Sequence, residues 1–186
     1  MQRLSEYFYQ KTTIWVVFIC LALFLLFLVM ILPTETTRAE PILGTTQTPD
    51  TLFYYSKAQL FQMAEEYGQE GRYYYVDSRV AFDIIWPFIY AIFLINSISW
   101  FLGKTVVEES KLRLLNLVPL LGILFDFLEN ISNMVVMFRY PQRMELLASL
   151  AGVFTSLKWV FVGGSFLILI FAILLWVAVK ANIIKT

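Results

Sequence analysis

The chain has 186 residues, of which 59% are hydrophobic and 15% charged, whereas a soluble domain is about 45–50% apolar and about 25% charged. This excess of apolar residues excludes an ordinary soluble protein. The 14 basic residues are balanced by 14 acidic ones, so there is no basic face to neutralise the phosphates of a nucleic acid. The chain has one cysteine and no histidine, which excludes an intrachain disulfide, the commonest general base and the usual zinc and haem ligands.

Four apolar segments are long enough to cross a membrane as helices. A span needs about 20 mostly apolar residues at about 1.5 Å of rise each. The first segment is longer than the apolar stretch of a signal peptide, and no small-residue cleavage site follows it, so we expect a retained helix. We therefore expect one all-α domain over residues 1–186, a four-helix transmembrane bundle with spans at about 14–32, 81–102, 114–138 and 157–179.

Lysine and arginine predict how this bundle is oriented. An even number of spans puts both termini on one side, where the short tails and a short loop carry basic residues at higher density than the long loop opposite. We therefore expect a multi-pass protein of the cell membrane, with both termini in the cytoplasm and residues 33–80 forming an extracytoplasmic loop. Residues 34–50 of this loop are rich in threonine and proline and are expected to form an irregular tether.

A short amphipathic helix is expected at 56–67, within the same loop. Ser56 followed by Gln59 is a capping-box signature. Apolar residues from Leu60 to Tyr67 then recur at helical spacing opposite a polar face. This helix is expected to lie on the membrane surface or to cover the bundle.

The third expected span carries a stripe of acids and amides. Asp126, Glu129, Asn130 and Asn133 are spaced at i, i+3, i+4 and i+7, which places them in one arc about 100° wide. A carboxylate that faces lipid near the bilayer centre costs on the order of 3 kcal/mol or more, so this face is expected to point into the bundle. The alternative to a functional site is a purely structural network of interhelical hydrogen bonds.

The second and fourth spans carry polar residues that match this stripe. Arg79, Asp83 and Tyr90 share one face of the second span, and the first two form an i,i+4 pair that can bridge. Lys158 is expected in the first turn of the fourth span. Three helices thus place polar groups in the outer half of the membrane, with Asp126 near its middle, which predicts a polar pocket that opens outward beneath the 56–67 helix. The alternatives to a pocket are that the arginine and aspartate form an ion pair at the membrane surface, that the tyrosine only packs, and that the lysine snorkels to the headgroups.

Small residues in the fourth span predict where two helices approach closely. Gly163, Gly164 and Ser165 stand together there. Small side chains at such positions let helix backbones come into contact inside a membrane.

Short motifs surround the polar residues of these spans. They are Tyr67-Gly68 with Gly71-Arg72, Phe82-Asp83 with Trp86-Pro87 and Tyr90, Asn116-Leu117-Val118-Pro119, Phe125-Asp126 with Glu129-Asn130, Arg139-Tyr140-Pro141, and Phe154-Thr155 with Lys158-Trp159. On these motifs, over roughly residues 52–175, the chain resembles an uncharacterised family of small four-span bacterial integral membrane proteins. The resemblance implies a four-helix fold and supplies no activity.

The favoured hypothesis is a protein that binds or senses a membrane lipid or a small amphiphile. Acids and amides of the third span would bind an amine or hydroxyl group, and the arginine and lysine an anionic group. The chain has no histidine, no nucleophile beside a base and no repeated metal motif, so binding is favoured over catalysis, and no metal or cofactor is expected. The candidate ligand-binding residues are Arg79, Asp83, Tyr90, Asp126, Glu129, Asn130, Asn133 and Lys158.

Three other hypotheses remain open. In a membrane-embedded lipid-modifying enzyme, Asp126 and Glu129 would be a general acid–base pair or hard ligands for Mg²⁺ or Mn²⁺. In proton-coupled transport, Asp126 would titrate. The third is an accessory subunit of a larger membrane complex. A homo-oligomer is compatible with the sequence, whereas a nucleic-acid partner is not expected.

Overall fold

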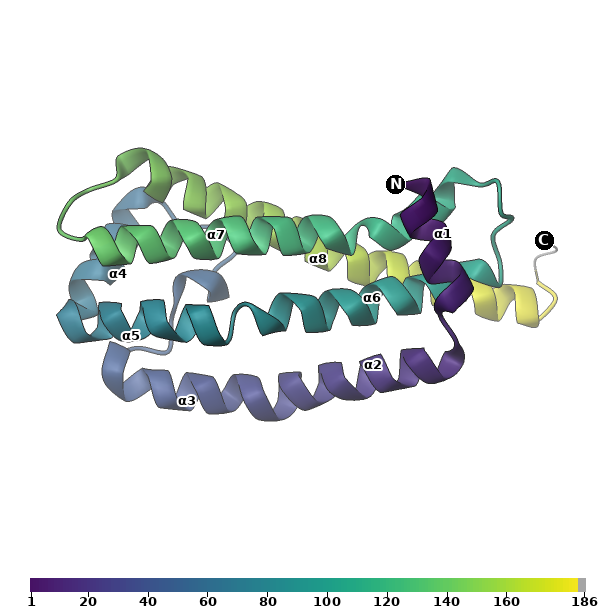
Figure 1. Cartoon of the computed structure of the whole chain (residues 1–186), viewed down its shortest axis with the longest axis horizontal. Helices are drawn as coiled ribbons and strands as arrows, with labels where there is room; N and C mark the ends of the chain where they lie inside the picture. Colours follow the sequence, from purple (N-terminus) through teal and green to yellow (C-terminus); the bar gives the residue numbers. More distant parts are fainter. Residues whose placement is uncertain (184–186) are drawn as a thin grey trace.

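The computed structural model describes residues 1–183, and within them the chain is all-α, with no strand. Four long helices run along the molecule (Figure 1), and each is long and apolar enough to cross a membrane. They comprise Ile14–Leu43, Gly68–Gly103, Lys111–Arg139 and Glu145–Lys180. The expected all-α architecture with four long apolar helices is confirmed, and every one of the four is longer than the sequence indicated.

The first long helix continues through Pro33, where the sequence predicts that it ends. It consists of α2 (Ile14–Leu26), a π-helical turn (Phe27–Ile31) and α3 (Leu32–Leu43). A proline lacks an N–H and crowds the carbonyl one turn earlier, which breaks a regular α-helix. In the π-helical turn the hydrogen bonds reach back five residues instead of four, so the proline enters at the first turn of α3 without ending the helix.

The irregular tether expected at 34–50 is therefore wrong for residues 34–43, which are helical. The helix ends at Gly44, whose φ of 71° is left-handed and favours glycine. Within residues 33–80 the non-helical part is residues 44–56, apart from the 3-10 turn Pro49–Thr51, together with Tyr67 between α4 and α5. The expected long loop is thus much shorter than residues 33–80.

The short helix predicted after this loop is confirmed as α4 (Lys57–Glu66). Its capping box is complete: the Ser56 N–H donates to Gln59 Oε1 at 2.8 Å, and the Gln59 N–H donates to Ser56 Oγ at 3.3 Å. Gly68, at a φ of 61°, then turns the chain directly into α5 (Gly68–Ala81).

The second long helix begins at Gly68, well before the expected boundary at residue 81. It is interrupted at residues 82–84 and resumes as α6 (Ile85–Gly103). Pro87 explains the position of this break, because its ring crowds the carbonyl four residues earlier and leaves that carbonyl without its helical donor.

The third long helix consists of the 3-10 segment Lys111–Leu117 and α7 (Pro119–Arg139), close to the expected 114–138. The fourth, α8 (Glu145–Lys180), begins twelve residues before the expected start at 157. Lys158 therefore lies about 20 Å from the start of α8, at about 1.5 Å per residue, instead of in its first turn.

An N-terminal helix that the sequence did not predict, α1 (Gln2–Lys11), crosses one end of the bundle. The N-terminus and the end of α8 lie together at this end, whereas α3, α4 and α5 lie toward the other (Figure 1). Ser5 of α1 donates to Asn116 Oδ1 at 2.8 Å, and Asn116 donates to Ser99 Oγ at 2.9 Å. These buried hydrogen bonds fix α1 to the 3-10 segment before α7 and to the end of α6.

The close contact predicted at Gly163 and Gly164 is wrong. Apart from the neighbouring residues and backbone of α8 itself, a Cβ added at either glycine would meet no heavy atom of the described chain within 4 Å, although Ser165 beside them is 0% exposed. The close approach lies at Gly152, where a Cβ would overlap the carbonyl oxygen of Tyr55 in the segment before α4. A backbone contact of this kind permits no side chain, so Gly152 docks that segment on α8.

Replacing Gly152 with alanine tests this contact. Gly152→Ala should destabilise the protein by about 1–3 kcal/mol, because the added methyl group forces the backbone of the Tyr55 segment away from α8. The melting temperature in mild detergent should fall by at least about 2 °C. Gly163→Ala on the same helix is the matched control and should leave the melting temperature unchanged or raise it slightly, because alanine is the better helix former. Equal losses from both variants would contradict this contact.

Candidate functional site

The polar face of α7 is buried between helices, as predicted. Glu129 and Asn133 are 0% exposed, Asn130 is 4% and Asp126 is 6% exposed. α7 packs along α8 and also contacts α5 and α6. Four polar groups on one helix face are therefore withdrawn from solvent, and each needs a partner to offset the loss of hydration.

Glu129 and Lys158 form the most deeply buried ion pair in the described chain. Lys158 Nζ on α8 lies 2.5 Å from Glu129 Oε2 on α7, and the lysine is only 5% exposed. Lys158 is thus neither in the first turn of its helix, as expected, nor snorkelling to the headgroups, which was the alternative; it forms a buried charge pair. Removing one partner of such a pair leaves an uncompensated charge, so the pair couples α7 to α8.

A second cluster forms around Arg79 of α5. Arg79 donates to Asp83 Oδ2 at 2.5 Å, which confirms the predicted i,i+4 pair and spans the break between α5 and α6. Its other terminal nitrogen lies 2.9 Å from Asp50 Oδ1, and its guanidinium lies 4.5 Å from the centre of the Tyr75 ring. Arg79 therefore joins three segments: α5, the break between α5 and α6, and the segment before α4.

Asp50 was not predicted as a site residue, because it lies in the threonine- and proline-rich stretch that shows no periodic pattern. Burial by itself would raise the pKa of Asp50, but the nearby charges of Arg79 and Lys158 outweigh burial and lower its pKa below the usual value. Asp50 is therefore ionised at neutral pH and acts as a counter-ion to Arg79.

Asp126 has neutral partners only. Tyr90 of α6 donates its hydroxyl to Asp126 Oδ2 at 3.0 Å, and Asn130 Nδ2 donates to Asp126 Oδ1 at 2.9 Å. No lysine or arginine within residues 1–183 forms an ion pair with Asp126. Asp126 thus differs from the other buried acids of the cluster, which all contact a cation.

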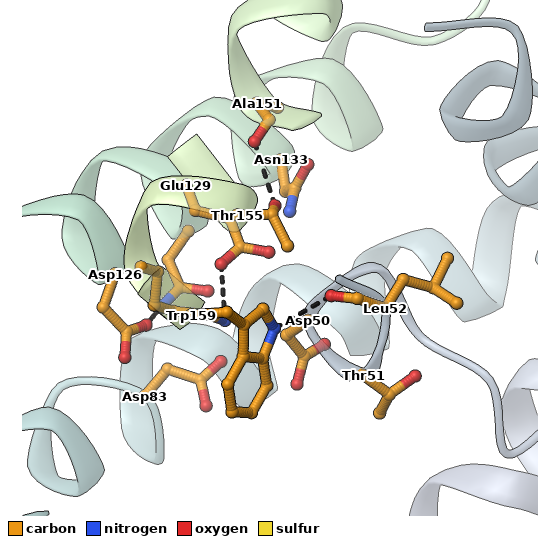
Figure 2. A network of polar contacts seen from close by, with 12 residues as sticks. Asp50, Thr51, Leu52, Asp83, Asp126, Glu129, Asn133, Ala151, Thr155 and Trp159 are labelled. Atoms are coloured by element: carbon orange, nitrogen blue, oxygen red, sulfur yellow. Dashed lines mark hydrogen bonds and ion pairs between the residues drawn. The ribbon is translucent and has the colours of Figure 1, made fainter. Parts of the chain in front are cut away.

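A cavity of about 740 Å³ brings most of these groups together. Figure 2 shows Asp50, Asp83 and Asp126 around the indole of Trp159, and all four line this cavity. Apolar side chains line much of the rest of the cavity. They come from α2, the π-helical turn, α6 and α8 and include Phe24, Leu28, Trp86, Val162 and Phe166. The wall therefore combines charged groups with aromatic and aliphatic ones.

The predicted site residues divide into two groups at this cavity. Those on its wall are Arg79, Asp83, Tyr90, Asp126, Asn130 and Lys158. Glu129 and Asn133 lie behind the wall: the first pairs with Lys158, and the second accepts a hydrogen bond of 2.8 Å from the Tyr55 hydroxyl.

The segment before α4 covers the cavity, and α4 itself contributes no lining residue, contrary to the predicted cover. Trp159 Nε1 donates to the Leu52 carbonyl at 2.9 Å (Figure 2), and Ser156 Oγ donates to the Phe53 carbonyl at 3.0 Å. The sequence shows no signal for this contact, because the acceptors are backbone carbonyls of an aperiodic segment.

No three acidic or cysteine side chains of the described residues are grouped so that they would hold a metal ion. Comparisons with protein-family models, with curated proteins and with solved structures found no match to this chain. The geometry of the cavity is therefore the basis for assigning a function.

Proposed function

We propose that the chain is a multi-pass membrane protein that binds or senses a lipid or small amphiphile in the cavity between α3, α6 and α8. The observation that supports this proposal is that the cavity wall combines charged groups with aromatic and aliphatic ones. A ligand with a polar head and an apolar body matches such a wall, since ligand pockets combine an apolar lining with a few placed polar groups.

The distribution of tryptophan supports a membrane position for the four long helices. Trp159 and Trp176 of α8 are separated by about 26 Å along the helix at about 1.5 Å per residue, close to the roughly 30 Å of a hydrocarbon core. Trp15 and Trp100 lie toward the same end as Trp176. In this placement the charged groups of the cavity, beside Trp159, lie near one membrane surface, and the first turns of α8 project beyond it.

The polar end of the ligand would provide the selectivity. An alkyl chain that moves from bilayer hydrocarbon onto the apolar side chains of the cavity exchanges one apolar surface for another and gains little. Charged and hydrogen-bonding groups near the membrane surface discriminate more strongly, because a mismatched polar group stays unpaired in a buried site. The residues around Asp126 would therefore decide which amphiphile binds.

A lipid-modifying enzyme is the second candidate, and the hydrogen bond between Tyr90 and Asp126 on the cavity wall favours it. A carboxylate and a phenol in contact can exchange a proton with a bound substrate. Chemical conversion of a retained molecule during incubation with the purified protein would distinguish an enzyme from a binding protein.

We also propose that both termini are cytoplasmic. The end of the bundle that carries the termini holds Arg3, Lys11, Lys104 and Lys111, and basic residues near span ends favour the cytoplasmic side. A reporter that is active only outside the cytoplasm should therefore stay silent when fused to the C-terminus, whereas a reporter active in the cytoplasm should give signal. The opposite pair of signals would reverse the orientation and the side on which the cavity opens.

Mass spectrometry of molecules retained by the gently purified protein tests the binding function. Thr36 is exposed on α3 and lines the cavity, so Thr36→Trp should obstruct it and reduce the retained amphiphile several-fold relative to the unmodified protein. Thr37 is also exposed but lies outside the lining, so Thr37→Trp is a matched control and should retain the amphiphile. If no molecule is enriched, or if both variants retain it equally, the proposal is wrong.

A further inference from the structure

The two cations on the cavity wall are already engaged by acids of the protein. Arg79 contacts both Asp50 and Asp83, and Lys158 contacts Glu129. One guanidinium and one ammonium are thus paired with three carboxylates of the protein before any ligand binds. An anionic headgroup would therefore compete with these acids for the two cations, and any acid that it displaced would stay buried without a cation.

Hydrogen-bond acceptors remain free on the same wall, beside one buried donor, Arg79 Nε. Asp126 has no ion-pair partner, and Asn130 Oδ1 is buried without a hydrogen-bond donor from the described residues. The side chains of Asp126 and Asn130 are more than nine-tenths buried and line the cavity. Two adjacent acceptors, one of them a carboxylate, are best matched by a donor that carries positive charge.

Aromatic rings surround the same part of the cavity. The Trp86 ring packs edge to face against Tyr90 at 5.8 Å between centroids and stacks on Phe24 at 5.6 Å. The electron-rich faces of tryptophan and tyrosine attract cations. The apolar side chains of Val162 and Phe166 line the same cavity and suit an alkyl chain.

We infer that the cavity selects an amphiphile with a primary ammonium head, which donates N–H bonds to Asp126 and Asn130 while its apolar chain lies along Phe24 and Phe166. This inference rests on the proposed binding function and narrows it to a cationic headgroup. A primary ammonium carries three N–H donors, whereas a quaternary ammonium has none, so the Asn130 acceptor distinguishes the two.

Calorimetric titration of the protein in phosphatidylcholine nanodiscs tests the inference with four decyl probes below their micellar concentrations: decylamine, decyltrimethylammonium, decanol and decanoate. Heat measured with empty discs is subtracted. At neutral pH decylamine is protonated, as a lysine side chain is. The variants are Asp126→Asn, which keeps the shape and removes the charge, and Asp77→Asn, which removes an exposed acid outside the cavity lining.

Decylamine should bind the wild-type protein and Asp77→Asn equally, and at least tenfold more weakly to Asp126→Asn. Decyltrimethylammonium should bind more weakly than decylamine, and decanol and decanoate should not distinguish wild type from Asp126→Asn. Equal affinity for decylamine, decanol and decanoate would overturn the ammonium inference and leave the amphiphile-binding function standing. Binding of no probe above the empty discs would overturn both.

A second set of discs identifies the source of the ammonium group. The head of phosphatidylethanolamine also carries a primary ammonium. Loss of decylamine affinity in discs that contain this lipid would assign the site to a lipid headgroup, whereas unchanged affinity would assign it to a single-chain amine. Either result requires the decylamine affinity that the inference predicts in phosphatidylcholine discs.

Discussion

The ion pair between Glu129 and Lys158 is the constraint on which the rest of the site depends. Two charges can be buried this deeply only if each finds the other at short range, because the cost of removing them from water otherwise exceeds any gain from packing. α7 and α8 therefore have to run together in one register, with Lys158 opposite the polar stripe of α7. This register also sets Gly152 of α8 against the backbone of Tyr55, and the Tyr55 hydroxyl in turn reaches Asn133.

Arg79 holds together the segments on another side of the cavity. Its contacts with Asp50 and Asp83 tie the segment before α4 to the second long helix at the point where Pro87 interrupts that helix. Trp159 and the neighbouring Ser156 hold the same segment from α8 through its backbone carbonyls. The cavity thus lies between the Glu129–Lys158 pair and the cluster around Arg79. The cations of both are paired with acids of the protein itself. Asp126 is left facing the cavity with neutral partners, which is why we assign the headgroup to it.

The sequence predicted the features that follow from periodicity. Apolar runs indicated four long helices, the Ser56–Gln59 pair indicated α4, and the spacing of acids and amides indicated a buried face on α7. Other features depend on contacts that leave no periodic trace. Pro33 predicts a helix end unless a π-helical turn precedes it, and the sequence does not encode that turn in any recognisable motif. Asp50 stands alone in an aperiodic stretch, and its importance appears only when Arg79 is placed beside it. The Gly163-Gly164 pair shows that small residues permit a close contact without requiring one.

We propose that two acids only one turn apart on α7 have different tasks: Glu129 supports the fold, and Asp126 binds the ligand. The variants Asp126→Asn and Glu129→Gln should be purified and measured side by side for melting temperature and for retained amphiphile. Glu129→Gln, which leaves the Lys158 ammonium buried without an anion, should lose about 3–5 kcal/mol, or about 6 °C or more in melting temperature. Asp126→Asn should melt close to the unmodified protein and lose the amphiphile. A stable Glu129→Gln, or an Asp126→Asn that unfolds early and still retains the amphiphile, would contradict this division of roles.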